Sequence, residues 1–233
     1  MRRTLAIALT VLTLSSVQSA ATDEDFNAKV RAYILDNPEV IVEALAVLAK
    51  RERTAETVAR LAAYPELFED LPVHGLGDLN APVRVIKFFD YKCVPCRLIH
   101  PKLVEMVDQH PELRVEMRHL PILTPGSERG ARFALAVRTV HGDAAYDQAH
   151  EMLWDVRGPI RSADFQRISA ELDLDLVKVT KAMDSSDVVG RIDYNRDVAI
   201  ALGILGTPAF VTPTSVTFGE NDPAVLLDLW LSQ

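Results

Sequence analysis

The stretch FFDYKCVPCRLIHPKL, residues 88 to 103, decides the fold of this chain. It contains Cys93 and Cys96, the only two cysteines among 233 residues. The run just before them, VRVIKFF at residues 83 to 89, is rich in β-branched and aromatic residues, which predicts a buried strand. After Cys93, apolar residues recur three to four positions apart, at Leu98, Ile99, Leu103, Val104 and Val107. This change of period predicts that a helix begins at the cysteine pair.

The position of the two cysteines favours a reactive pair. A disulfide between them would close a loop of only a few residues and would gain little chain entropy, so a structural staple is the weakest interpretation. The free N–H groups and the positive dipole end of the helix would face a thiolate on Cys93, and Pro95 is tolerated in a first helical turn. Lys92 and Arg97 add positive charge. We therefore predict that Cys93 is a nucleophile with a lowered pKa and that Cys96 is the resolving thiol.

A metal site is the alternative use of the same thiols. Cys96 and His100 are four residues apart and would share a helix face, which gives the pattern C-x-x-C-x-x-x-H. Three ligands at one helix start, without a second C-x-x-C or an H-x-x-x-H elsewhere, do not complete a four-ligand zinc site. We predict no resident metal.

The N-terminus has the features of an export signal. Residues 1 to 21, MRRTLAIALTVLTLSSVQSAA, begin with Arg2 and Arg3, continue with an apolar stretch from 5 to 14 and end in small residues. The apolar stretch is shorter than the roughly 20 residues needed to span a bilayer, although an uncleaved anchor is the alternative. We predict a signal peptide over residues 1 to 20 and an exported, soluble mature protein in the periplasm.

Charge and length narrow the function classes. The chain has 33 acidic and 25 basic residues, a formal net charge of −8, and loss of Arg2 and Arg3 with the signal peptide would make it −10. A nucleic-acid partner is therefore not expected. The mature length permits one core of good size with a small appendage.

A second motif lies more than a hundred residues after the cysteines. LGILGTPAFVT, residues 202 to 212, passes through Thr207 and Pro208 into a short apolar strand, and a proline is tolerated only at the start or edge of a strand. Together with the earlier C-x-x-C, the motif resembles the thioredoxin superfamily, in which a cis proline faces the dithiol. The resemblance implies that Thr207 and Pro208 bind substrate, with the backbone of residue 207 pairing with an extended client segment.

The segments around these motifs resemble the DsbA-like disulfide oxidoreductases. The resemblance is carried by FFDYKCVPC (88 to 96), LPILTPGSERGARFALA (120 to 136) and NRDVAIALGILGTPAFV (195 to 211). It covers about residues 72 to 233 and implies an α/β thioredoxin fold interrupted by a helical insert at about 126 to 185. Thiol–disulfide exchange in this family needs no cofactor, so none is expected.

The first part of the mature chain predicts a helical extension. Residues 26 to 63 show two helical stretches broken around Asn37 and Pro38. The second stretch has an apolar band wider than one helix face requires, formed by Val40, Ile41, Ala44, Leu45, Val47 and Leu48. It resembles the N-terminal extension of ScsC-like (suppressor of copper sensitivity) proteins, which holds protomers together. That implies an oligomerisation region over residues 21 to 65 and a homodimer or homotrimer; the alternative is a helix folded back on its own catalytic domain.

Two positions depart from the family pattern. Many relatives have an acidic residue six positions before the first cysteine, where it is thought to accept the proton of the resolving thiol, and this chain has Lys87. A partly buried Lys87 would have a lowered pKa and could act as a neutral amine or pair with a carboxylate; water or Asp90 could also carry the proton. The dipeptide between the cysteines is Val94-Pro95, where ScsC-like and DsbC-like proteins commonly have Gly-Tyr. This dipeptide tunes the redox potential, so oxidase, isomerase and reductase all stay open.

The sequence thus predicts a periplasmic thiol:disulfide oxidoreductase that acts on cysteine-containing exported proteins. Disulfide isomerisation is favoured, and a membrane redox partner would recycle the dithiol. The rivals from other classes are a copper or zinc carrier that uses the same thiols and a binding module without catalytic activity.

Overall fold

The computed structural model describes residues 17–69, 74–219 and 222–232. Most of the predicted signal peptide, residues 1–16, lies outside the described residues, and so do residues 70–73, which follow the predicted oligomerisation region. The chain divides into an N-terminal unit, Met1–Arg53, and a C-terminal unit, Thr54–Gln233. Within the described ranges, no helix combines the length and the apolarity needed to cross a membrane.

The N-terminal unit consists of helix α1, Val17–Asp36, and the first part of helix α2, Glu39–Leu61. The break between them falls at Asn37 and Pro38, as predicted, because the residue before a proline is disfavoured in a helix. Large apolar side chains are exposed along both helices: Phe26, Val30, Tyr33, Leu35, Ile41, Val42, Leu45, Val47 and Leu48. The N-terminal unit therefore carries far more apolar surface than it covers by itself.

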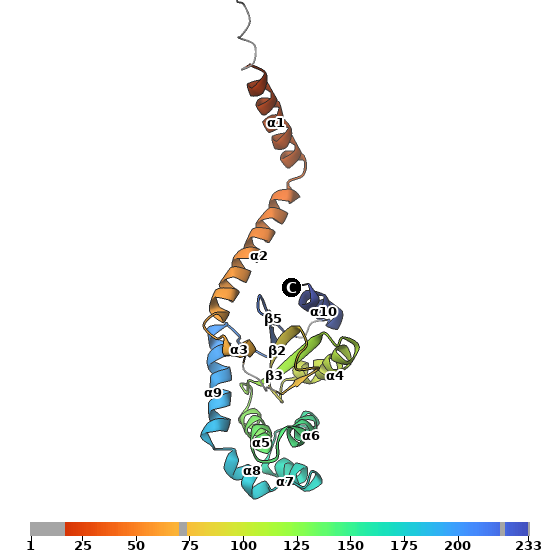
Figure 1. Cartoon of the computed structure of the whole chain (residues 1–233), viewed down its shortest axis with the longest axis vertical. Helices are drawn as coiled ribbons and strands as arrows, with labels where there is room; N and C mark the ends of the chain where they lie inside the picture. The colour runs from red at the N-terminus through yellow and green to blue at the C-terminus, as the bar shows by residue number, and fades with distance from the viewer. Residues whose placement is uncertain (1–16, 70–73, 220–221, 233) are drawn as a thin grey trace, which may run out of the picture. The chain divides into compact units, whose positions relative to one another are not determined.

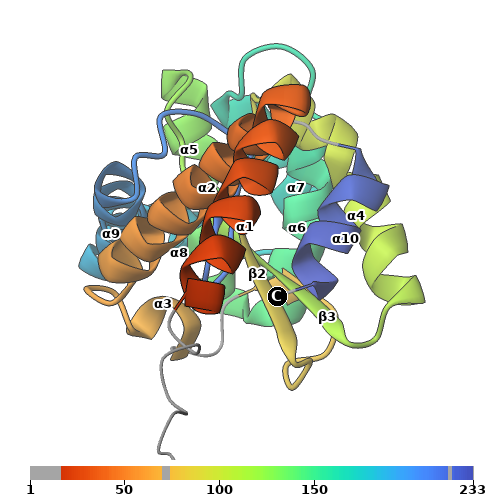
Figure 2. The same cartoon turned by 90° about the horizontal axis from the view of Figure 1, so that it is seen from above.

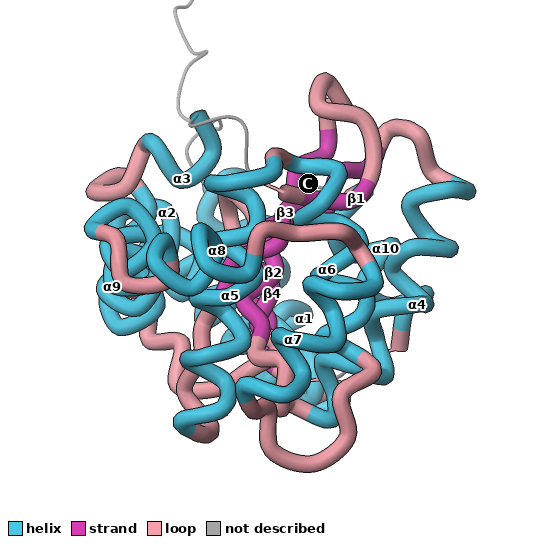
Figure 3. Tube along the Cα trace, turned by 90° about the horizontal axis from the view of Figure 1, so that it is seen from below, coloured by secondary structure: helices cyan, strands magenta, loops and turns pink. Residues whose placement is uncertain are grey.

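The C-terminal unit is built on a five-stranded sheet, which Figure 3 shows surrounded by helices. The strands, in chain order, are β1 Gly75–Leu76, β2 Val83–Phe89, β3 Leu113–His119, β4 Ala209–Val211 and β5 Val216–Phe218. Their order in the sheet is β1-β3-β2-β4-β5, with β2 and β3 parallel and the other pairs antiparallel. β2 is therefore the central strand.

Both faces of β2 are covered, which explains why apolar residues point to each of them. Val85 and Phe89 belong to one core cluster, whereas Ile86 and Phe88 belong to the other. On the first face, helix α4 (Val94–Gln109) packs beside helix α10 (Pro223–Leu231), and Figure 2 shows the two next to each other. The second cluster contains Leu67 of helix α3 (Glu66–Glu69), Val198 of helix α9 (Ser186–Ala201) and Leu61 at the end of α2.

A group of helices separates β3 from β4 in the chain. Its members are α5 Pro125–His141, α6 Asp143–Trp154, α7 Ser162–Glu171, α8 Leu176–Ala182 and α9. Helix α5 packs against α6, α8 and α9, and Figure 1 shows α5 to α8 gathered beyond one end of the sheet. A thioredoxin-type sheet interrupted by a helical insertion, with helices α1 and α2 before it, is the predicted fold class, which is confirmed.

Candidate active site

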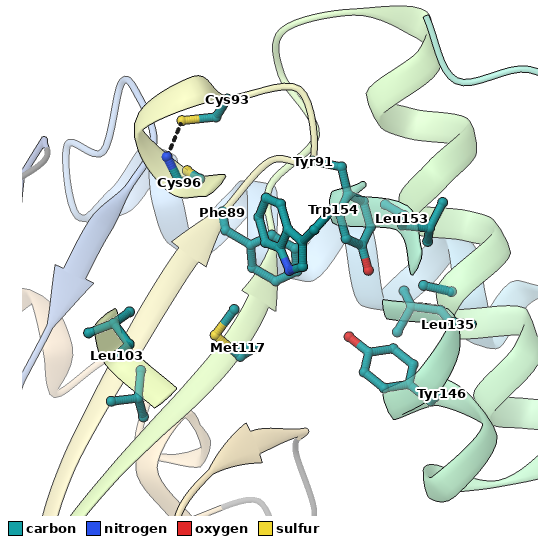
Figure 4. Close-up of a cluster of buried hydrophobic side chains, with 14 of the residues drawn as sticks. Phe89, Tyr91, Cys93, Cys96, Leu103, Met117, Leu135, Tyr146, Leu153 and Trp154 are labelled. Atoms are coloured by element: carbon teal, nitrogen blue, oxygen red, sulfur yellow. Dashed lines mark hydrogen bonds between the residues drawn. The ribbon is translucent and has the colours of Figure 1, made fainter. Parts of the chain in front are cut away.

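The turn from β2 into α4 places Cys93 at the helix N-terminus. Cys93 is the N-cap residue, with φ −76° and ψ 111°, and Pro95 lies in the first turn. The Sγ of Cys93 accepts a hydrogen bond of 3.2 Å from the backbone N–H of Cys96, drawn as the dashed line in Figure 4. Both cysteines are free thiols, with Cys93 4% exposed and Cys96 fully buried. An approaching group thus meets Cys93 first.

The second motif closes the other side of the thiol. The carbonyl oxygen of Thr207 lies 3.1 Å from Cys93 Sγ, although 114 positions separate the two residues in the chain. The Thr207–Pro208 peptide bond is cis, as predicted, and Pro208 immediately precedes β4. The fold thus brings together Cys93, Cys96, Thr207 and Pro208, the four residues proposed from the two motifs.

The two thiols differ in acidity. The pKa of Cys93 is lowered to about 6, chiefly because the Cys96 side chain donates a hydrogen bond to its sulfur. The Thr207 side chain and the Cys96 backbone N–H lower it further, and burial opposes the shift. Burial raises the pKa of Cys96, and the hydrogen bond and charge of Cys93 raise it further. At neutral pH the pair therefore holds one thiolate, on Cys93, and one thiol, on Cys96.

Lys87 lies next to the dithiol and contacts Cys96. Its side chain is fully buried, and Nζ donates to the backbone carbonyl of Cys96 at 3.4 Å while lying 5.5 Å from the centre of the Trp154 ring. Burial lowers the pKa of Lys87 to about 8, and the charges of Cys96, Cys93 and Glu151 partly offset that effect. The sequence predicted a partly buried amine; the structure encloses it completely.

Asp90, which the sequence left open as a proton carrier, accepts hydrogen bonds from the backbone of two loops. Its Oδ1 accepts from the backbone N–H of Lys92 at 2.7 Å, and its Oδ2 accepts from Ile122 and Leu123 at 3.0 Å each. The carboxylate thereby ties the loop before Cys93 to the loop after β3. Because both oxygens already accept hydrogen bonds, Asp90 is better suited to positioning the site than to moving protons.

A buried cluster of aromatic and histidine side chains packs next to the dithiol, and no pattern in the sequence predicted it. Trp154 Nε1 donates to His150 Nε2 at 3.0 Å, and His150 Nδ1 lies 2.6 Å from the hydroxyl of Tyr91. Since an indole N–H can only donate, the His150 proton is on Nδ1 and points to Tyr91. Burial lowers the pKa of His150 well below its usual value. The four-residue spacing of His150 and Trp154 was the one signal in the chain for this contact.

The cysteines do not share a metal site with nearby ligands in the described part of the chain. The one group there whose side chains could hold an ion is His100, His150 and Glu151, whose ligand atoms lie within 4.8 Å of one another. His100 Nε2 already bonds to Glu151 at 2.9 Å, and both nitrogens of His150 are engaged with Tyr91 and Trp154. A metal ion would have to break these buried bonds, so the group fits packing better than ligation.

Two protein-family models match the chain. The DSBA-like thioredoxin domain matches residues 84–229, which includes the cysteine pair and the Thr207–Pro208 turn. The copper resistance protein ScsC N-terminal domain matches residues 24–55.

Individual proteins show the same relationship. A thioredoxin-like oxidoreductase from Silicibacter pomeroyi DSS-3 is 32% identical, with a TM-score of 0.65 over 71% of this chain and 94% of that chain. Proteus mirabilis ScsC in a transitional conformation is 24% identical, with a TM-score of 0.67 over 91% of this chain and 97% of that chain, and at this identity it shows the fold alone.

One relative is a much longer protein that matches this chain over a small part of its length. The Na(+)/H(+) antiporter NhaA 3 of Salinispora tropica is 30% identical over 137 residues, which are 59% of this chain but 21% of the antiporter. The chain thus spans about a fifth of the length of that relative. From the domain match, the Silicibacter pomeroyi oxidoreductase and the paired thiols, the chain belongs to the DsbA-like thioredoxin domain family of thiol–disulfide oxidoreductases.

Proposed function

We propose that this protein works in the periplasm, where it exchanges disulfides with cysteine-containing exported proteins through Cys93 and Cys96. The observation that carries the proposal is the position of Cys93 Sγ, which is hydrogen-bonded by Cys96 at a helix start and lies 3.1 Å from the Thr207 carbonyl. The features of an export signal in residues 1 to 20 support the location.

The exchange has two steps. The Cys93 thiolate attacks one sulfur of a client disulfide, forms a mixed disulfide and releases the other client sulfur as a thiolate. Cys96, after losing its proton, attacks Cys93 Sγ and releases the second client thiolate, so that the client is reduced and the Cys93–Cys96 pair is oxidised. The reverse sequence oxidises a client dithiol. Val94 and Pro95, between the two sulfurs, tune the balance between the two directions.

The surroundings of Cys93 suit an unfolded client segment. The backbone of Thr207, next to Pro208, can pair with an extended peptide. Val94 beside Cys93 is 52% exposed, and Leu205, two residues before Thr207, is 89% exposed. Exposed apolar side chains next to a reactive sulfur favour protein clients over small thiols.

Among the exchange reactions, isomerisation fits the N-terminal unit best. The match to the ScsC N-terminal domain and the exposed apolar side chains of α1 and α2 both support self-association into a homodimer or homotrimer. Covering about 400 Å² of that surface would contribute about 10 kcal/mol before the costs of association. Several Cys93 sites in one assembly would recapture a released client at high effective concentration, which suits disulfide shuffling. A membrane redox partner would keep the dithiol reduced.

One experiment separates this function from a metal carrier and from a binding module. The reduced protein is mixed with a disulfide-containing peptide, with and without one equivalent of Zn²⁺ or Cu⁺. We expect exchange in metal-free buffer, slowed by metal that occupies the thiols. No exchange together with tight metal binding would support the carrier, and neither activity would support the binding module.

A further inference from the structure

We propose that Lys87 is the proton acceptor for Cys96. Its neutral amine takes the Cys96 thiol proton as Cys96 attacks the mixed disulfide, and its ammonium returns that proton when a client thiolate attacks Cys93 and expels Cys96. The proposal rests on the proposed function of the dithiol and adds the group that completes its second step.

The need for an internal acceptor follows from burial. Cys96 is fully buried, and burial holds its pKa above the ordinary value, so its thiol does not ionise by itself at neutral pH. Lys87 is also fully buried and contacts the same residue, with Nζ 3.4 Å from the Cys96 carbonyl oxygen. The charge of Lys87 lowers the Cys96 pKa, so the two groups interact electrostatically.

Three other titratable groups near the site are already engaged, and one of them, Glu151, bonds to His100. Both carboxylate oxygens of Asp90 accept backbone hydrogen bonds. His150 accepts from Trp154 on one nitrogen and bonds to Tyr91 with the other. Lys87 has a different environment, because among the described residues its ammonium meets a weak carbonyl contact of 3.4 Å and an aromatic face 5.5 Å from Nζ. Of these groups, Lys87 can most easily change protonation without breaking a strong bond.

The charges that face Lys87 change during the reaction. They come from Cys93 and Cys96 on α4 and from Glu151 on α6, while His150, also on α6, is neutral. In the reduced protein the Cys93 thiolate helps to keep the amine protonated. Once Cys93 is part of the mixed disulfide that negative charge is gone, and Lys87 loses its proton more readily at the step in which Cys96 needs an acceptor.

Proton transfer also creates a favourable pair. A thiol and an amine become a thiolate and an ammonium, and these opposite charges attract strongly in a buried site. The thiolate then forms the new bond to Cys93 Sγ while the client sulfur leaves with the bonding electron pair. A glutamate at position 87 could accept the same proton, but it would become neutral and leave the thiolate without a cation.

Stopped-flow reaction of the reduced protein with dithiobis(nitrobenzoate) separates the two steps. The first coloured thiolate released reports attack by Cys93, and the second reports resolution by Cys96. We expect Lys87→Met to slow the second phase by about a hundredfold. The first phase should change by less than about tenfold, which corresponds to one unit in the Cys93 pKa. Lys87→Glu should restore most of the second phase, and Lys102→Met, on the exposed face of α4, should change neither.

The wild-type protein provides a test that does not depend on folding of the variants. Its second phase should accelerate as the pH rises through the Lys87 pKa of the mixed disulfide, which lies below the value of about 8 in the reduced protein because the Cys93 charge is gone. The first phase should instead follow the Cys93 pKa of about 6. The proposal is overturned if the second phase is independent of pH in this range, or if a folded Lys87→Met variant keeps the wild-type second phase. A failure of the proposed function would instead appear as no release of the first thiolate by wild-type protein.

Discussion

At the scale of single residues, Cys93 and Cys96 acquire opposite chemistry from one helical turn. Cys93 is outside the first turn, where the N–H of Cys96 points at its sulfur at 3.2 Å. Cys96 is inside that turn, with its sulfur in the core cluster of the sheet and α4. Hydrogen bonds to the charged form lower a pKa and burial raises one; the hydrogen bonds outweigh burial at Cys93, whereas burial dominates at Cys96.

The lowered pKa of Cys93 predicts how its reactivity varies with pH. In the Cys96→Ser variant, whose hydroxyl can still donate to Cys93, alkylation by iodoacetamide should rise about tenfold per pH unit and level off above pH 6 to 7. The sign follows from the thiolate being the nucleophile, so that activity is lost as the pH falls through the Cys93 pKa. The measurement is the alkylation rate from pH 4 to 9. A midpoint near the ordinary thiol value of about 8.5 would show that the helix start does not activate Cys93.

At the scale of elements, the end of α2 belongs to the core of the C-terminal unit. Leu61 is 7% exposed and packs in the cluster that covers the second face of β2, whereas Val58, one turn earlier, is 43% exposed. Leu61→Ala should lower the free energy of unfolding by about 2 to 4 kcal/mol, since it leaves a cavity. The matched control Val58→Ala should cost at most about 0.5 kcal/mol. Urea denaturation measures both, and equal losses would contradict this packing.

Elements defined by local pattern were the ones that the sequence could predict. The buried strand at 83 to 89, the helix after Cys93, the break at Asn37 and Pro38 and the strand after Pro208 all follow from residues close in the chain. Their signals are periodicity and the backbone restrictions of proline, which do not depend on tertiary contacts.

The buried cluster of aromatic and histidine side chains next to the dithiol could not be predicted in the same way. His119 on β3 bonds to Tyr146 on α6 at 2.8 Å, and Tyr91, in the loop after β2, bonds to His150 on α6. These partners come from segments whose contacts exist only after folding. Complete burial of Lys87 has the same origin, because Trp154 reaches it from the end of α6.

At the scale of the whole molecule, we expect the N-terminal unit to set the oligomeric state and the isomerase activity. Deleting residues 22–53, which stops short of Leu61 in the core, should leave a folded, redox-active monomer with reduced isomerisation of a scrambled-disulfide protein. Leu45→Asp should weaken association because it places a charge among exposed apolar side chains, whereas Arg51→Asp on the same helix should weaken it less. Light scattering gives the mass. A full mature chain that is monomeric at tens of micromolar would remove the main support for isomerisation.

The proposed function requires that Cys93 forms the covalent bond to the client and that Cys96 resolves it. The most direct test is to incubate the reduced Cys96→Ser variant with a peptide that contains one disulfide, quench with acid and locate the peptide by mass spectrometry. We expect a stable mixed disulfide on Cys93, no adduct on the Cys93→Ser variant, and little adduct on the wild-type protein because Cys96 releases it. An adduct on Cys96 in the Cys93→Ser variant at the same rate, or no adduct on Cys93, would contradict the proposed function.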